Sequence, residues 1–468
     1  MKTALTFKDF SFSFADILHV DRIEVDELPD QHGTLRIQAV LDADLEGSIF
    51  FQVPRKLSLL YEDDEGEKPL FSGLLVRSSM KRKGKYLYLE LEAKSHTYQM
   101  DLKREIRSFQ NEEETGGQVI REILKDYPDC ICMEHFEDGP IGQFLLQYEE
   151  TDWEFIRRVV NKYHGRLYPQ SSMGQPAFAI GFPKEGDGSL PQEFFSSSLS
   201  FDVYEDRKAN ASQGLMPQQF FSWNVESYEI IPLGARISYR GKDWLVGGVK
   251  RRLEKGLLKN AYTLVQEETQ ICPPAYNPLL PGISLDGTVK NVVRDRLQVI
   301  MDFDSNTRTA GQYWFPYSTV AGSSDGSGWY CMPEAGERIR IYFPEGDEGK
   351  AYAISALSGN TLGNQGVSMD PASKHISTAQ GNTVTFNGDG ANISVKGGTG
   401  SVHLGSGGDL DITAAVSISI YAGSKVTFQG NEILAAADQQ MKLSADPGAS
   451  IQMEPGQTDL KAVKIYQN

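Results

Sequence analysis

The C-terminal part of the chain repeats a short pattern of apolar and polar positions at a near-constant step. One apolar residue opens each unit, and in most units a second follows two places later. Because period two places both residues on one face of a strand, the pattern predicts a series of very short strands with one apolar face. The units open at Val384, Ile393, Val402, Leu410, Ile418, Val426, Leu434, Met441, Ile451 and Val463.

Strands this short cannot form a stable structure alone. Two inward-facing apolar residues do not bury a core, and repeats of this kind are stable only when neighbours cover them. Glycines in the turns suit the tight reversals that such a stack needs. The tail is therefore expected to be a rod that packs against copies of the same chain, and its function is expected to be mechanical.

The N-terminal part reads as β structure with two helices. Alternating apolar residues predict strands in residues 1–110 and again in 170–275, for example at Leu87, Leu89 and Leu91. A first short helix is expected after Thr115 and before Pro128.

A second helix has the clearest local signal, in the segment from Gln147 to Gly165. Thr151 is expected to be its N-cap, Glu154 completes a capping box, and Asp152 favours the positive end of the helix dipole. The carboxylates of this segment could instead form an acid/base cluster, but capping accounts for them without catalysis.

Two prolines and an Asn-Pro pair predict a linker at 271–280, and a compact β unit follows it. Five or six short strands in about 80 residues are typical of a small Greek-key barrel of the OB type. The expected strands include Leu297–Phe303, Gln312–Pro316, Gly328–Pro333 and Glu337–Phe343.

Composition narrows the possible classes. The 468 residues and 52.0 kDa suggest two to four domains. The net charge of −17 disfavours a nucleic-acid or anionic-membrane partner. Four cysteines do not make a disulfide framework, and no signal peptide or membrane span is expected. Residues 361–468 hold only four aromatic residues, which marks a boundary near 360.

The order of these parts resembles that of VgrG proteins and phage late-control hub proteins. The Gln147–Gly165 segment resembles their Gln-Tyr-x-Glu-(Ser/Thr)-Asp signature before a helix. The stretches Arg296–Asp304, Met332–Ile339 and Phe343–Asp347 resemble their OB domain, and the β rod completes the pattern.

The resemblance implies a mainly β fold with a few short helices. It implies four parts: a hub of tube-like β-barrel domains with helical insertions at 1–270, a linker at 271–280, an OB-fold neck at 281–358 and a triple-stranded, interleaved β-helix or β-prism needle at 359–468. No lysozyme-like insert and no fused effector domain is expected, because the rod follows the barrel after a short gap and ends the sequence given.

The implied function is that of a homotrimeric hub and spike of a contractile injection machine, which joins an inner tube to a membrane-puncturing needle. Implied partners are an Hcp-like tube protein, baseplate proteins, a PAAR-like tip protein, cargo effectors and, transiently, the target membrane. The particle would assemble in the cytoplasm and be expelled on firing. The expected trimer core of the spike is Val384, Ile393, Val402, Leu410, Ile418, Ile420, Val426, Met441 and Ile451.

Possible chemical sites are weak, and no catalytic, cofactor or metal residue is predicted. Gly322–Gly326 matches the G-x-S-x-G spacing, but a loop and a strand follow instead of a helix. Cys130, Cys132 and His135 make at best half a zinc site. Gly405–Asp411 resembles a single calcium repeat, although such sites need tandem copies. The histidines of the rod, His375 and His403, could hold an axial ion, but solvated histidine is the simpler interpretation.

Two other functions remain as alternatives. A carbohydrate-cleaving β-helix enzyme, such as a phage-type depolymerase, would need coils of about 20 residues or more and a groove with paired carboxylates. An OB-fold nucleic-acid binder would need a basic groove, yet residues 278–358 hold 7 basic and 10 acidic residues. Secretion system and phage tail stay equally open.

Overall fold

The protein, seen in a computed structural model, forms two compact units, Met1–Gly359 and Asn360–Asn468. Both are mainly β, as the sequence predicts. The residues that the structure describes are 4–13, 17–42, 55–181, 190, 195–211, 214–304, 306–319, 331–354, 372–378, 380–445 and 448–464.

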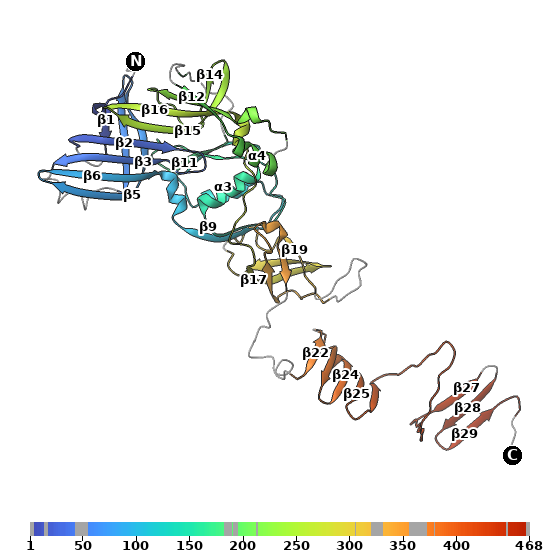
Figure 1. The fold of residues 1–468 in the computed structure, drawn as a ribbon. Coiled ribbons are helices and arrows are strands. Elements are labelled where there is room, and N and C mark those ends of the chain that lie inside the picture. Colours follow the sequence, from blue (N-terminus) through green and yellow to red (C-terminus); the bar gives the residue numbers. More distant parts are fainter. Residues whose placement is uncertain are drawn as a thin grey trace. The chain divides into compact units, whose positions relative to one another are not determined.

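An 11-stranded sheet is the largest sheet described in the first unit (Figure 1). Its strands follow the order β1-β4-β5-β6-β3-β2-β15-β16-β13-β12, and β14 pairs with β15. One core lies beneath β2–β6 and another beneath β13–β16. The bounds are β1 Phe10–Phe12, β2 His19–Glu27, β3 Thr34–Asp42, β4 Lys56–Asp63, β5 Gly66–Lys83, β6 Tyr86–Ser95, β12 Phe195–Leu199, β13 Phe221–Ser227, β14 Arg236–Tyr239, β15 Lys242–Glu254 and β16 Leu257–Val265.

The predicted alternation is present in this sheet. Leu87, Leu89 and Leu91 of β6 are buried, whereas Tyr86, Tyr88 and Glu90, which alternate with them, are exposed. Burial of one face in this way fixes the pairing register, because a slip of one residue would turn every leucine to solvent.

Within the first unit, helices and short strands lie between the large sheet and the predicted barrel region at 281–358. Strands β7 and β9 pair, and β10, β11 and β8 form a small sheet. Helices α2 and α3 pack in one core beside them. The bounds are η3 His96–Asp101, β7 Arg104–Phe109, α2 Gly116–Leu124, β8 Ile131–His135, β9 Leu145–Thr151, α3 Asp152–Lys162, β10 Leu167–Pro169 and β11 Ala177–Gly181.

Helix α4, Phe201–Asn210, is absent from the sequence-based expectation. Only Tyr204 of this helix is buried, and its N-cap Ser200 makes no side-chain capping bond. A helix with neither an apolar stripe nor a capping signal leaves no pattern to detect.

The predicted barrel region contains five strands whose path closes on itself. The order is β19-β18-β17-β20-β21, and a parallel bridge between Tyr317 and Ala353 joins the two ends. The expected strand at Gly328–Pro333 is wrong in its described part, since residues 331–333 are not a strand. The bounds are β17 Ser284–Val293, β18 Arg296–Met301, β19 Trp314–Pro316, β20 Arg338–Tyr342 and β21 Tyr352–Ile354.

The second unit contains two separate antiparallel sheets. The first has the order β22-β23-β24-β25-β26 and the second β27-β28-β29, so each strand pairs with its sequence neighbour. The bounds are β22 Lys374–Ser377, β23 Thr383–Asn387, β24 Gly390–Val395, β25 Gly400–Gly405, β26 Leu410–Ala414, β27 Met441–Ala445, β28 Ala449–Glu454 and β29 Gln457–Lys461.

The strands expected around Ile418, Val426 and Leu434 are not present in the single chain. Residues 415–440 have no regular secondary structure. A strand needs at least one neighbouring strand to pair with, and residues 416–440 have none in the described part of the molecule.

Candidate functional site

The N-terminus of α3 is held by the residues that the sequence singles out. Thr151 is the N-cap: its Oγ1 accepts from the Glu154 amide at 3.2 Å, and Glu154 Oε2 accepts from the Thr151 amide at 3.0 Å. Asp152 accepts hydrogen bonds from Tyr127 at 2.8 Å and from Arg107 at 2.6 Å. These carboxylates are thus used in capping and ion pairing, which leaves none of them free for acid/base chemistry.

A buried triad of charges fastens α3 to the closed five-strand region. Arg158 donates to both carboxylate oxygens of Glu150, at 2.9 and 2.8 Å, and to Glu348 Oε1 at 2.5 Å. Burial disfavours the guanidinium charge, but Glu348 and Glu150 outweigh this and raise the pKa of Arg158. Glu348 begins η6, Glu348–Lys350, which directly precedes β21. The buried guanidinium of Arg158 therefore links α3 to the five-strand region.

Further contacts make this junction continuous. Phe144 and Leu146, next to and on β9, lie in the same core as β17–β21. Asp304 accepts from the amide and hydroxyl of Ser108 on β7, and the Asn306 amide donates to the Ser108 carbonyl at 2.8 Å. A load on one side of the junction would therefore reach the other through packed, hydrogen-bonded groups.

The predicted linker is part of the same junction. Residues 271–280 contain no helix or strand, yet they are not a free tether. Asn277 is fully buried and donates to the Tyr148 carbonyl at 2.7 Å, and Leu280 is buried in the core of β17–β21.

A second network joins the turn after β2 to the start of α3. His32 contacts Thr97 at 2.8 Å through Nδ1 and Asp101 at 2.9 Å through Nε2, and Asp101 accepts from Thr151 at 2.5 Å. The residue types resemble a nucleophilic triad, but Thr97 is only 1% exposed and no substrate could reach it. The network is therefore structural.

This network predicts acid sensitivity in the first unit. Burial lowers the pKa of His32 below its ordinary value of 6.5, and the opposing effect of Asp101 does not cancel it. The unfolded chain thus binds a proton that the folded chain excludes, so stability falls as the pH drops from about 6.5 towards 5. Burial lowers the pKa of His96 as well, which adds in the same direction. Urea unfolding of His32→Gln should show a smaller loss between pH 7.5 and 5.5 than the native chain, and an equal loss would contradict this assignment.

The first sheet of the tail has one apolar and one polar face. Its register places like residues opposite one another on each face. The apolar rows are Ile376, Val384, Ile393, Val402 and Ile412, and then Phe386, Ala391, Leu404 and Leu410 with Lys374 at their end. The polar rows are His375, Thr385, Asn392, His403 and Asp411, and then Ser377, Thr383, Ser394, Ser401 and Thr413. Hydroxyl pairs cross the polar face at Thr383–Ser394 and Ser401–Thr413.

The second sheet of the tail repeats this division. Leu443, Ile451 and Leu460 lie opposite one another on one face, while Lys442, Gln452 and Asp459 share the other. In the described part of this unit, no hydrophobic side chain is buried. Both sheets therefore present apolar faces that the described part of the chain leaves unburied.

The stretch between the sheets is exposed to an even greater degree. Val416 is 95% exposed and Leu434 87%, and the expected core residues Ile418 and Ile420 are 54% and 62% exposed. Isolated exposed apolar residues are common on proteins, but a continuous run of this kind marks a surface meant for contact.

The expected core residues of the spike divide by location. Val384, Ile393 and Val402 lie on neighbouring strands in one row of the first sheet. The others lie at its edge, in 415–440 or in the second sheet: Leu410, Ile418, Ile420, Val426, Met441 and Ile451. Their shared role in a trimer stays a prediction.

The weak chemical signals find no site in the described residues. Burial raises the pKa of Cys130 and Cys132 to about 12, so neither is a ready thiolate ligand. His375 and His403 lie on the polar face, opposite the apolar rows, which disfavours an axial ion among those rows. The Gly322–Gly326 motif lies outside the described residues. No group of three or more possible metal ligands occurs in the described ranges, and no described helix has the length and apolarity to span a membrane.

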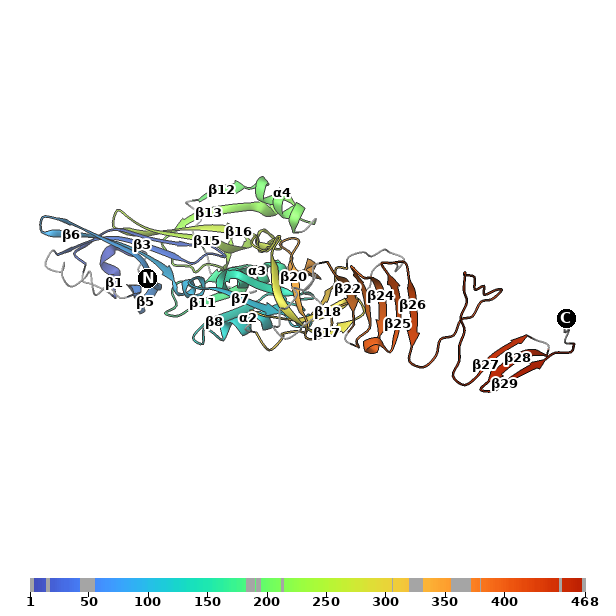
Figure 2. The ribbon, with the colours of Figure 1, turned by 90° about the horizontal axis from the view of Figure 1, so that it is seen from below.

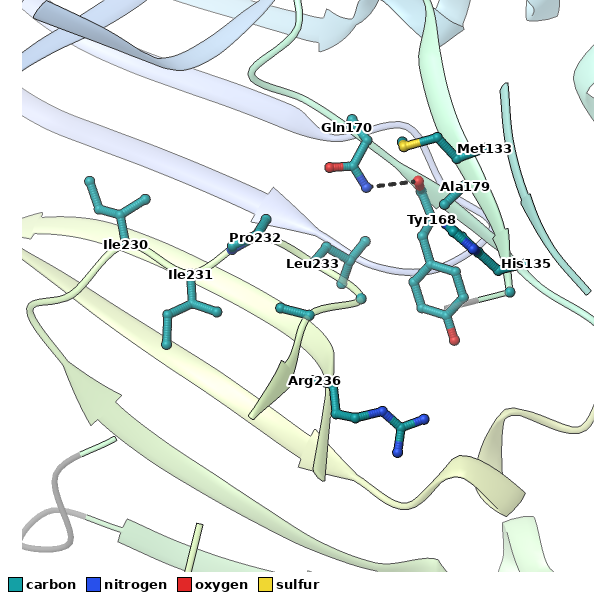
Figure 3. Close-up of a pocket in the computed structure, with 13 residues that line it drawn as sticks. Met133, His135, Tyr168, Gln170, Ala179, Ile230, Ile231, Pro232, Leu233 and Arg236 are labelled. Carbon is teal, nitrogen blue, oxygen red and sulfur yellow. Dashed lines mark hydrogen bonds between the residues drawn. The ribbon is translucent and has the colours of Figure 1, made fainter. Parts of the chain in front are cut away.

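A cavity of about 400 Å³ lies in the first unit, between the β8–β10–β11 sheet and residues 230–236 (Figure 3). Its walls are largely apolar, with Ile230, Pro232 and Leu233 on one side. The ionisable side chains among its described lining residues are those of His135, Tyr168 and Arg236. These lining residues do not include the paired acids that glycoside hydrolysis uses.

Sequence reasoning missed Arg158 and Glu348. A charge on the inner face of an amphipathic helix is a usable signal, because Arg158 lies beside the buried Phe155 and Val159 and must have a partner. The identity of that partner, 190 residues away, is not encoded in local spacing.

Comparisons with known proteins agree with this architecture. No protein-family model matches the chain, and no curated protein matches its sequence. Among solved structures, the E. coli c3393 protein superposes with a TM-score of 0.53 at 15% identity, covering 74% of this chain and 98% of that one. It is described as a type VI secretion component similar to the T4 phage tail proteins gp27 and gp5.

A chain of the Francisella PdpA–VgrG complex in its lidded form gives a TM-score of 0.53 at 9% identity, covering 84% of this chain and 76% of that one. A chain of the lidless PdpA–VgrG complex gives 0.52 at 8% identity, covering 84% and 93%. At these identities the comparison concerns the fold. The chain has the fold of VgrG-like hub and spike proteins.

Proposed function

We propose that this protein is the homotrimeric hub and spike of a contractile injection machine, where it joins an inner tube to a puncturing needle. The observation that carries the proposal is the tail: both of its sheets have one apolar face, and none of its described hydrophobic side chains is buried. The fold, which matches solved hub and spike structures over 74% and 84% of the chain, supports the same role.

Three chains explain the tail better than one. A lone sheet of three to five strands with an open apolar face is marginal in water, and residues 415–440 have no pairing partner in the described chain. Copies that turn their apolar faces to a common axis would bury those faces and leave the hydroxyl rows hydrated. Strands shared between chains would also remove free lateral edges.

The junction around Arg158 suits the transmission of force. In this proposal the sheath supplies the force, and the spike passes it on without buckling. The buried charges and shared core between α3 and β17–β21 would keep hub and neck from shearing. The protein would act as a structural part and not as an enzyme.

The proposed partners follow from the role. The hub would bind an Hcp-like tube protein and baseplate proteins, and the needle could carry a PAAR-like tip and cargo effectors. The particle would assemble in the cytoplasm and be expelled on firing, with transient contact to the target membrane.

The mass of the purified protein by light scattering tests the proposal. The full chain should give a trimer near 156 kDa, three times 52.0 kDa, and removal of residues 361–468 should weaken that trimer. The truncated chain keeps the packed first unit and so controls for folding. A stable monomer of the full chain would overturn the proposal and favour the depolymerase alternative.

The depolymerase alternative has its own test. Its tail would need a single-chain β-helix, whereas the described tail strands form antiparallel sheets of sequence neighbours. Release of sugar from capsule or peptidoglycan by the purified protein would favour the enzyme.

A further inference from the structure

The hairpin of β5 and β6 has a basic end on an acidic protein. Residues 77–89 contain five basic residues, Arg77, Lys81, Arg82, Lys83 and Lys85, and no acidic residue, although the chain carries a net charge of −17. Such a concentration of charge against the overall sign is the type of feature that directs association.

The tip is built on paired strands. Strand β5 pairs with β4 as far as Leu74 and with β6 as far as Lys83, and β6 pairs on its other side with β3 as far as Tyr86. Lys83 pairs with Tyr86 across a two-residue turn, in which Gly84 has φ +60°. A glycine at this position suits a tight hairpin turn, and the tip is presented on ordered strands.

Charge changes sign along the outer face of the hairpin. Near its base, Glu90 accepts from Gln38 at 3.2 Å and Glu92 lies near Arg36. Towards the tip, Lys81 and Lys83 lie opposite Tyr88 and Tyr86. In the described part of the molecule, Lys81, Lys83 and Lys85 have no ion-pair partner. The acidic residue Asp42, at the end of β3, lies opposite Tyr86 of β6.

A lysine lies close to the ring of each exposed tyrosine. Lys83 Nζ lies 5.3 Å from the Tyr88 ring centroid, and Lys85 Nζ lies 5.7 Å from that of Tyr86. Single-stranded nucleic acid is bound by a basic groove lined with aromatic faces, whereas the described basic residues here lie on a hairpin turn and the strands beside it. Among the described residues of the tip, Leu87 and Leu89 are buried in the core and so present no surface to a membrane.

The tip lies at the end of the first unit that is remote from β17–β20 (Figure 2). We propose that it docks onto an acidic protein surface, the rim of the ring-forming tube protein that the hub would meet there. The assignment rests on the proposed function, in which the neck leads to the needle and the opposite end faces the tube. Complementary charge at such a rim would set orientation and speed encounter.

The test measures binding of the full-length protein to purified rings of the tube protein from the same machine. Lys81→Glu/Lys83→Glu/Lys85→Glu should bind about tenfold more weakly or worse at low salt, and the difference should shrink at about 0.5 M salt. The three Lys→Arg replacements should bind normally. Lys208→Glu/Lys242→Glu/Lys350→Glu makes the same change of charge at exposed positions elsewhere and should also bind normally.

The outcomes distinguish a failure of the docking assignment from a failure of the proposed function. If native protein binds rings and the tip variant binds equally well, the docking assignment is wrong and the proposed function stands. If native protein binds no ring, both fall. If the native protein is retained on single-stranded DNA through these lysines, the partner of the tip is nucleic acid and not an acidic protein. Thermal melting and light scattering should show that every variant keeps its fold and mass.

Discussion

Ile418→Asp is expected to convert the trimer of about 156 kDa into a monomer of 52.0 kDa. The substitution would bring three carboxylates together near the axis of the spike, where each would lose hydration beside two like charges. Ile418 is half exposed in the single chain, so the monomer itself should tolerate the aspartate. Light scattering of the purified variant measures the effect directly.

Ser417→Asp is the matched control. Ser417 precedes Ile418, is exposed, and falls on the outward position of the period-two pattern. The same carboxylate there should leave the trimer intact. A trimer that survives Ile418→Asp, or one that is lost equally with Ser417→Asp, would show that the proposed register is wrong.

The second large effect is expected for Arg158→Leu in the first unit. The change leaves Glu150 and Glu348 buried side by side without their shared cation. Removing one partner of a buried ion pair typically costs about 3–5 kcal/mol, and here two partners are stranded. Denaturant unfolding of the first unit, followed by its tryptophan fluorescence, should show a loss of that order in the free energy of unfolding.

Two further variants isolate the cause. Arg157→Leu removes the same charge from the neighbouring, half-buried position and should cost much less. Combining Arg158→Leu with Glu150→Gln and Glu348→Gln removes the unpaired charges and should recover part of the loss. If Arg158→Leu costs no more than Arg157→Leu, the junction does not depend on the triad.

Local patterns in the sequence predict much of this fold. Alternation at Leu87, Leu89 and Leu91 predicts β6, and the capping residues Thr151 and Glu154 predict the start of α3. The period of the tail predicts two-faced strands, as found at Val384 and Ile393. These features depend on residues within a few positions of one another.

Other features depend on partners distant in sequence or outside the chain. The contact of Arg158 with Glu348 spans 190 residues, and no local spacing predicts it. Helix α4 lacks both stripe and cap. The units at Ile418 and Val426 have the pattern of strands, but a strand also needs a neighbour, and one chain does not supply it in the described residues. The basic tip of β5–β6 is readable as composition, yet its isolation at one end of the unit emerges only from the fold.

The unpaired stretch at 415–440 has a consequence for biogenesis. If this stretch orders only when three chains meet, tails that have not yet met would expose apolar, aggregation-prone surface, and at low concentration they would do so for longer. The first unit is synthesised earlier, and three copies of it held together would confine their tails to a small volume. The three tails would then have a high effective concentration, so that assembly of the needle would no longer depend on the concentration of the protein in the cell.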